Sequence, residues 1–66
     1  MKSDELIRKL RRLGDVEIDA NRGKGGHIEV RRRGRVSYVP TGSRDMKTGL
    51  VHGILRQLGL TIRDLP

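Results

Sequence analysis

The chain has 66 residues, and cysteine, tryptophan and phenylalanine are all absent, which excludes disulfides and thiolate metal sites. This length is enough for one small domain, residues 1–66, with a modest hydrophobic core. No apolar run reaches the 18 or so residues of a membrane span, and the charged start lacks a signal-peptide core. We therefore expect a soluble, cytoplasmic domain without a membrane partner.

Positive charge is concentrated in the middle of the chain. Fifteen basic residues face eight acidic ones, for a net charge of +7. Residues 1–21 are balanced, whereas residues 22–36 carry six basic side chains against Glu29 alone. Such clustering is typical of proteins that bind polyanions. The alternative is a basic surface that serves only solubility.

Residues 3–13 are predicted to form a helix. Ser3 is a favourable N-cap, and Gly14 is placed to end the helix in a left-handed conformation. The apolar residues recur at helical spacing on one face: Leu6, Ile7, Leu10 and Leu13.

Two strands are predicted next, because apolar and polar residues alternate. In the first, Val16, Ile18 and Ala20 share one face; residues 21–26 are too rich in glycine to be anything but a loop. In the second, Ile28 and Val30 face the core, and the opposite face carries His27, Glu29 and Arg31.

The register of the following hairpin can be predicted from its apolar residues. A two-residue turn at Arg33-Gly34 would place Val30 opposite Ser37, which mismatches the apolar faces. A three-residue loop, residues 32–34, instead places Val30 opposite Val36 and Ile28 opposite Tyr38. We adopt the second register. It turns Tyr38 toward the core, so that a sheet surface for stacking nucleobases is not expected.

Pro40 closes the third strand, and a second helix is predicted over residues 46–58. Its buried side consists of Leu50, Val51, Ile54, Leu55 and Leu58. Thr61 is placed to cap one further turn, residues 62–65. The order is helix, three antiparallel strands, helix: an α+β fold with both helices on the apolar face of the sheet and the other face bare.

Two groups of residues are candidates for binding RNA. Arg31, Arg32, Arg33 and Arg35 crowd one end of the hairpin, where phosphates would relieve their mutual repulsion. In the glycine loop, the backbone of Gly25 and Gly26 can approach a phosphate closely, with Lys24 as a point charge. The alternatives are a solvated hairpin tip and a flexible loop.

His27 is the candidate catalytic residue. It lies on the polar face of its strand, where packing does not require it, and histidine titrates near neutral pH. RNA supplies its own nucleophile, the 2′-OH, so one proton-transfer group with nearby cations suffices for cleavage. Carboxylates do not cluster in the basic half, which disfavours a two-metal nuclease; we expect no metal and no cofactor. The alternative is an ordinary exposed histidine, which is also our interpretation of His52.

The segment Lys24-Gly25-Gly26-His27 resembles the Lys-Gly-Ser-His segment of HicA toxins, the small mRNA interferases of type II toxin–antitoxin pairs. The helix that opens the chain, the strand at residues 36–40 and the segment at residues 54–60 are also similar to that family. The sequence differs from the family at Gly26, where serine is usual, and at residues 41–43, where a histidine is often found.

The resemblance implies a double-stranded-RNA-binding-like α-β-β-β-α fold, a metal-independent endoribonuclease acting on mRNA, His27 as its catalytic histidine, and a HicB-type antitoxin as its partner. We expect this antitoxin to cover the bare, basic face of the sheet with an acidic surface. The alternative function is a non-catalytic double-stranded-RNA-binding or ribosome-associated module.

Overall fold

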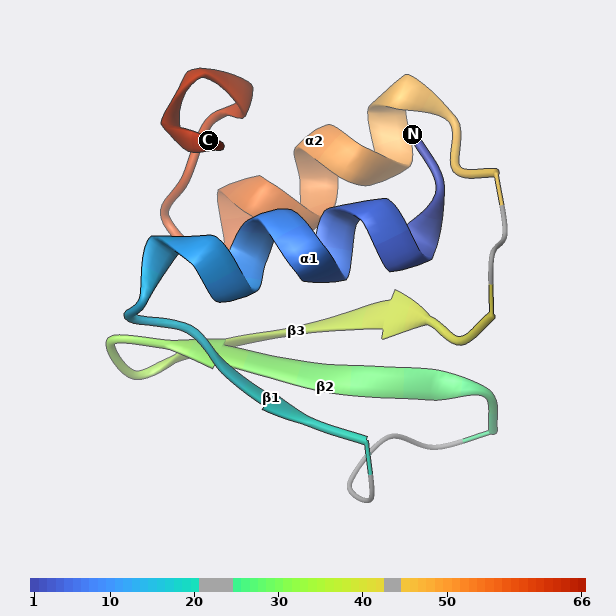
Figure 1. The fold of residues 1–66 in the computed structure, drawn as a ribbon, viewed down its shortest axis with the longest axis horizontal. Coiled ribbons are helices and arrows are strands. Elements are labelled where there is room, and N and C mark those ends of the chain that lie inside the picture. Colours follow the sequence, from blue (N-terminus) through green and yellow to red (C-terminus); the bar gives the residue numbers. More distant parts are fainter. Residues whose placement is uncertain (21–24, 43–44) are drawn as a thin grey trace.

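The computed structural model describes residues 1–20, 25–42 and 45–66. Its elements follow the order α1 (Ser3–Leu13), β1 (Glu17–Asp19), β2 (His27–Arg32), β3 (Arg35–Pro40), α2 (Thr48–Gln57) and a single 3-10 turn, η1 (Ile62–Asp64). The strands form an antiparallel sheet in the order β1-β2-β3. Both helices lie on the same side of this sheet, as Figure 1 shows. The predicted α-β-β-β-α arrangement, consistent with a double-stranded-RNA-binding-like fold, is confirmed.

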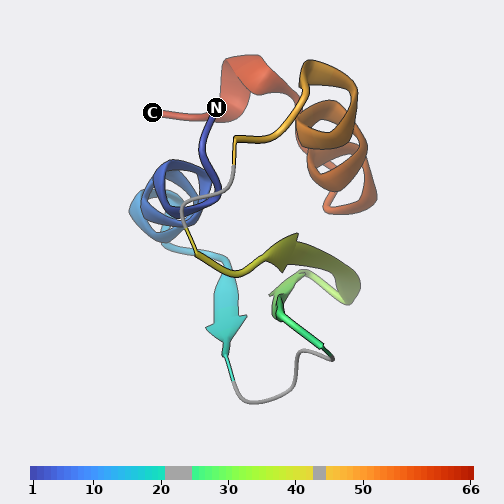
Figure 2. The ribbon, with the colours of Figure 1, turned by 90° about the vertical axis from the view of Figure 1, so that its right-hand side faces the viewer.

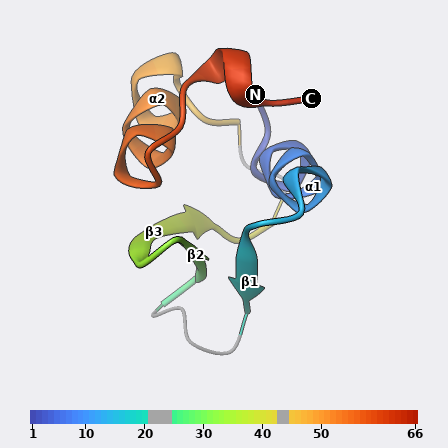
Figure 3. The same ribbon diagram turned by 90° about the vertical axis from the view of Figure 1, so that its left-hand side faces the viewer.

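The core lies between the helix layer and the sheet. Viewed end-on, α1 lies on the side of β1 and α2 on the side of β3 (Figures 2 and 3). The sheet contributes Val30 and Val39, which are fully buried. The other buried apolar side chains come from the helices and their flanks: Leu6, Leu10, Met46, Val51, Ile54, Leu55, Leu58 and Leu60. No helix in the described parts of the chain is long and apolar enough to cross a membrane.

The start of α1 differs from the prediction in its cap. Lys2 is the N-cap residue, and Ser3 is the first residue of the helix. The Ser3 hydroxyl is buried and donates a hydrogen bond to the carbonyl oxygen of Gly42, which ties α1 to the segment after β3. The predicted end is confirmed, since Gly14 adopts a φ of 85° and its N–H bonds to the Arg11 carbonyl.

The predicted register of the β2–β3 hairpin is wrong. Arg32 pairs with Arg35 and Val30 with Ser37, so the connection is the two-residue turn Arg33-Gly34. Both turn residues have positive φ, 49° and 81°. Positive φ at both central residues is typical of the type I′ turn, whose twist matches that of the flanking strands.

This register exchanges the two faces of β3. Ser37 and Val39 point into the core, with exposed fractions of 1% and 0%. Val36 and Tyr38 lie instead on the bare face, 39% and 47% exposed. A buried serine is tolerated because its hydroxyl bonds to the side-chain carbonyl of Gln57 on α2. That bond removes the cost of an unsatisfied polar group.

The second helix is shorter than predicted, Thr48–Gln57, and Leu50 is exposed rather than buried. The turn after it was predicted correctly. Thr61 caps η1 with a reciprocal pair of hydrogen bonds involving Asp64. Hydrogen bonds from the Thr61 backbone and then from its side chain lower the pKa of the exposed Asp64 carboxyl.

Candidate RNA-cleavage site

His27 is the first residue of β2 and is exposed. Its pairing partner is Pro40, and the alternation along β2 places Ile28 and Val30 toward the core. His27 therefore lies on the bare face of the sheet, together with Glu29 and Arg31, as predicted. A side chain at this position can contact a large substrate without any rearrangement of the core.

The residues just before His27 have a backbone suited to close approach. Gly25 and Gly26 have φ values of 53° and 83°; the space beside Gly25 is open, and the Thr41 hydroxyl lies beside Gly26. The Gly26 carbonyl accepts hydrogen bonds from the backbone N–H of Thr41, at 2.7 Å, and from its hydroxyl, at 2.9 Å. Thr41 thus anchors Gly26, the residue that precedes His27. Lys24, the predicted point charge of this loop, lies outside the described residues.

The four hairpin arginines do not form a cluster around His27. Five residue steps of β2 separate His27 from Arg32, about 16 Å at about 3.3 Å per residue. The candidate residues thus fall into two groups at opposite ends of β2, and Arg31 is the only one of the four that shares the bare face of β2 with His27.

Arg31 and Arg32 are bonded to protein partners, and the side chain of Arg35 lies against the C-terminal end of α2 without a hydrogen bond or ion pair to the described residues. Arg31 Nε is 2.7 Å from the Glu29 carboxylate, and Arg32 Nε is 3.0 Å from Asp15. Arg32 also donates a hydrogen bond of 3.1 Å to the carbonyl of Leu58, at the C-terminal end of α2. Arg35 packs its side chain toward Gly59 at the same end of α2. Cations are favourable there because the helix dipole is negative at its C-terminus.

Arg33 differs from the other three. Its side chain is 73% exposed, and its contact with Asp15, at 3.4 Å, competes with the shorter bond of Arg32 to the same carboxylate. An exposed ion pair of this kind is weak. Arg33 is therefore available to a phosphate.

The bare face of the sheet is not basic, which corrects the prediction. The pairings place Asp19 beside Glu29 and Glu17 beside Arg31. Glu29 is 6% exposed, held between Arg31 and the Tyr38 hydroxyl, which lies 3.5 Å from it. Among the described residues of this face, three carboxylates accompany Arg31 and His27. Even so, no group of three possible metal ligands is found in the described ranges.

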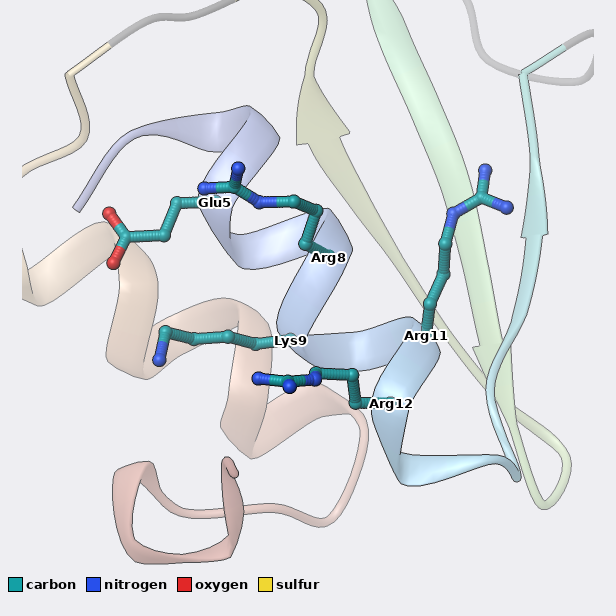
Figure 4. Close-up of a pocket in the computed structure, with 5 residues that line it drawn as sticks. All are labelled: Glu5, Arg8, Lys9, Arg11 and Arg12. Carbon is teal, nitrogen blue, oxygen red and sulfur yellow. The ribbon is translucent and has the colours of Figure 1, made fainter.

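A basic surface that the sequence analysis missed lies on α1. A shallow hollow on the helix is lined by Glu5, Arg8, Lys9, Arg11 and Arg12. Figure 4 shows Arg11 pointing to a different side of the helix from Lys9 and Arg12. Counting charge by segment hid this surface, because the acidic residues Asp4 and Glu5 are gathered in the first turn of α1. If the charged residues are placed at helical spacing, as the apolar residues were, this basic surface becomes visible in the sequence.

The end of α1 and the hairpin form one basic end of the molecule. Asp15, just after α1, contacts both Arg32 and Arg33. Arg11 and Arg12 lie in the last turn of the same helix. This end, with Arg33 at its tip, gathers exposed basic side chains from α1 and the hairpin.

Residues 3–60 match the model of the HicA toxin family, toxins of bacterial toxin–antitoxin pairs. The chain belongs to the HicA toxin family. No curated protein and no solved structure matched in the other two comparisons. The family assignment therefore stands on the sequence match, and the fold agrees with the arrangement that the resemblance implied.

Proposed function

We propose that this HicA-family toxin is a metal-independent endoribonuclease that cleaves mRNA in the cytoplasm and is neutralised by a HicB-type antitoxin. The observation that carries the proposal is the position of His27. It is an exposed imidazole at the start of β2, directly after two glycines, of which Gly25 has open space beside it. Family membership supplies the context of a toxin.

In this mechanism the substrate contributes the nucleophile. His27 takes the proton of a ribose 2′-OH as general base, or delivers a proton to the leaving 5′-oxygen as general acid. Gly25 and Gly26 admit the scissile phosphate next to the imidazole, and their backbone N–H groups are the donors closest in sequence to the charge that develops there. The basic end formed by α1 and Arg33 holds the RNA backbone at a distance from the cut.

The deciding experiment is cleavage of a single-stranded RNA by the purified protein in excess EDTA. We expect cleavage by the wild type and none by His27→Ala. His52→Ala is the matched control, since His52 is the other histidine, exposed on α2 and away from the sheet. Cleavage that requires added metal, or that survives in His27→Ala, would contradict the proposal. RNA binding without any cleavage by the wild type would favour the alternative, a non-catalytic RNA-binding module.

Neutralisation is tested separately by co-expression. A HicB-type antitoxin is expected to restore growth to cells that express the toxin. A structure of the pair in which His27 is open to solvent would show that inhibition does not act by covering the site.

A further inference from the structure

Tyr38 is the single aromatic residue of the chain, and it lies on the same face of the sheet as His27. It is 47% exposed, while its neighbours Ser37 and Val39 are buried. Packing does not require a large ring at this position, because the core lies on the other side of β3. Its surroundings therefore point to a role in binding.

The register places Tyr38 close to His27. His27 pairs with Pro40, and Tyr38 precedes Pro40 by two residues on the same face. Such diagonal neighbours are about 7–8 Å apart, within reach of an aromatic side chain. The Tyr38 hydroxyl lies 3.5 Å from Glu29, its cross-strand partner, so the ring leans from β3 toward the strand that carries His27.

The charge around Tyr38 favours a nucleobase over a phosphate. The neighbouring carboxylates of Asp19 and Glu29 repel phosphate, and Arg31 is already paired with Glu29. On the side of Tyr38 nearer to His27, this face of β3 continues with Pro40, which is uncharged and half-buried. An uncharged, flat base suits the surface around Tyr38 better than the charged sugar–phosphate backbone does.

We propose that Tyr38 stacks on the nucleobase next to the scissile phosphate and so positions RNA at His27, an inference that rests on the proposed ribonuclease function. Aromatic stacking is available to every base, because each has a π face. It fixes the height of the ribose above the sheet, and thereby the approach of the 2′-OH to the imidazole. Tyr38 is a positioning residue, and the phosphate contacts are made elsewhere.

The chain itself provides the probe. Tyr38 is its only aromatic residue, so the intrinsic fluorescence of the protein reports on this side chain alone. A short single-stranded 2′-O-methyl oligoribonucleotide binds without being cleaved at the ribose. We expect it to quench the tyrosine emission, with saturation at the same concentration as binding measured by fluorescence anisotropy of a dye-labelled copy.

Three variants separate stacking from simple apolar contact. Tyr38→Phe retains the ring and is expected to bind within about twofold of the wild type. Tyr38→Leu retains apolar bulk without a π face and is expected to bind about 5- to 150-fold more weakly. Val36→Ala, a change to the other exposed apolar side chain on the same face of β3, is the matched control and should bind like the wild type. Cleavage by Tyr38→Leu should show a raised KM.

Unchanged tyrosine emission at saturating RNA, or wild-type binding by Tyr38→Leu, would overturn the proposal. Emission that changes only when a HicB-type antitoxin is added would also overturn it, and would assign Tyr38 to a protein interface. Absence of RNA binding by the wild type would remove this proposal and the proposed function together. If RNA quenches Tyr38 and the Leu variant binds weakly, but no RNA is cut, stacking stands and the ribonuclease function alone fails.

Discussion

The two ends of β2 use polar residues for different purposes. At the hairpin end, arginines are bonded to the protein itself: Arg32 joins the α1–β1 connection, through Asp15, to the carboxyl end of α2. At the other end, His27 follows two glycines on a face that packs against no helix. The arginines of the hairpin therefore link parts of the fold to one another, in addition to offering a surface for binding. The less conspicuous end of the strand is the better candidate for chemistry.

The largest expected effect is on the rate at the His27 end. We expect His27→Ala to lose about 10²- to 10⁴-fold in cleavage rate, as a lost general acid or base does. The free energy of unfolding should change by no more than about 0.5 kcal/mol, because the side chain is exposed. Thermal melting, RNA binding and cleavage on this one variant test the assignment. A variant that fails to fold would show that His27 is needed for the stability of the fold.

The converse is expected of Arg32. Its side chain is 15% exposed and bonds to both Asp15 and the Leu58 carbonyl. Arg32→Ala should lower the free energy of unfolding by about 1–3 kcal/mol, since it removes charged hydrogen bonds and leaves partly buried partners unpaired. Each kcal/mol corresponds to a fall in melting temperature of about 4–8 °C in a domain of this size. If the variant melts like the wild type but loses RNA binding, the hairpin end is a binding surface after all.

Substitution of Arg33 tests whether the hairpin end has a binding role in addition to its structural one. It is a non-glycine residue with positive φ, a conformation that costs on the order of 1 kcal/mol and that asparagine tolerates better. Arg33→Asn should therefore raise the melting temperature slightly and weaken RNA binding several-fold. The slope of log affinity against log salt should fall by about 0.7, the loss of one phosphate contact on a single strand. Unchanged affinity and salt slope would remove Arg33 from the RNA-binding residues.

The smallest effect concerns the capping of η1. The pKa of Asp64 is lowered by hydrogen bonds from Thr61, so its carboxylate stabilises the folded state above the pKa of the unfolded chain. This contribution is lost as the pH falls through the lowered, folded pKa. Asp64→Asn should reduce the acid dependence of melting slightly and leave RNA cleavage unchanged. Equal acid dependence in the two proteins would show that the cap does not contribute.

The sequence was sufficient to predict the helices, the strand order and the exposure of His27. Apolar residues at helical spacing, the left-handed Gly14 and the alternation of β2 are all local signals. The register of the hairpin is not local. It depends on Gln57, 20 residues beyond Ser37, which satisfies the buried hydroxyl. The wrong register also placed Tyr38 on the core face, because a shift of one residue moves every side chain of a strand to the other face.

The basic surface of α1 escaped prediction for a different reason. Acidic and basic residues cancel when they are summed along the chain, yet the helix separates them, with acids in its first turn and Arg11 and Arg12 in its last. The partners of the hairpin arginines were equally invisible, because Asp15 and Leu58 come from distant parts of the sequence.

Strand β3 also has a bearing on the behaviour of the protein at high concentration. Within the described sheet it pairs with β2 on one side, so its other edge presents main-chain donors and acceptors. Exposed Val36 and Tyr38 make this edge a template for pairing with a second chain, and hence for aggregation. The strand begins at Arg35 and ends at Pro40, which has no N–H to offer. A charged start, a proline end and a net charge of +7 are three features that oppose pairing between copies of the toxin at this edge.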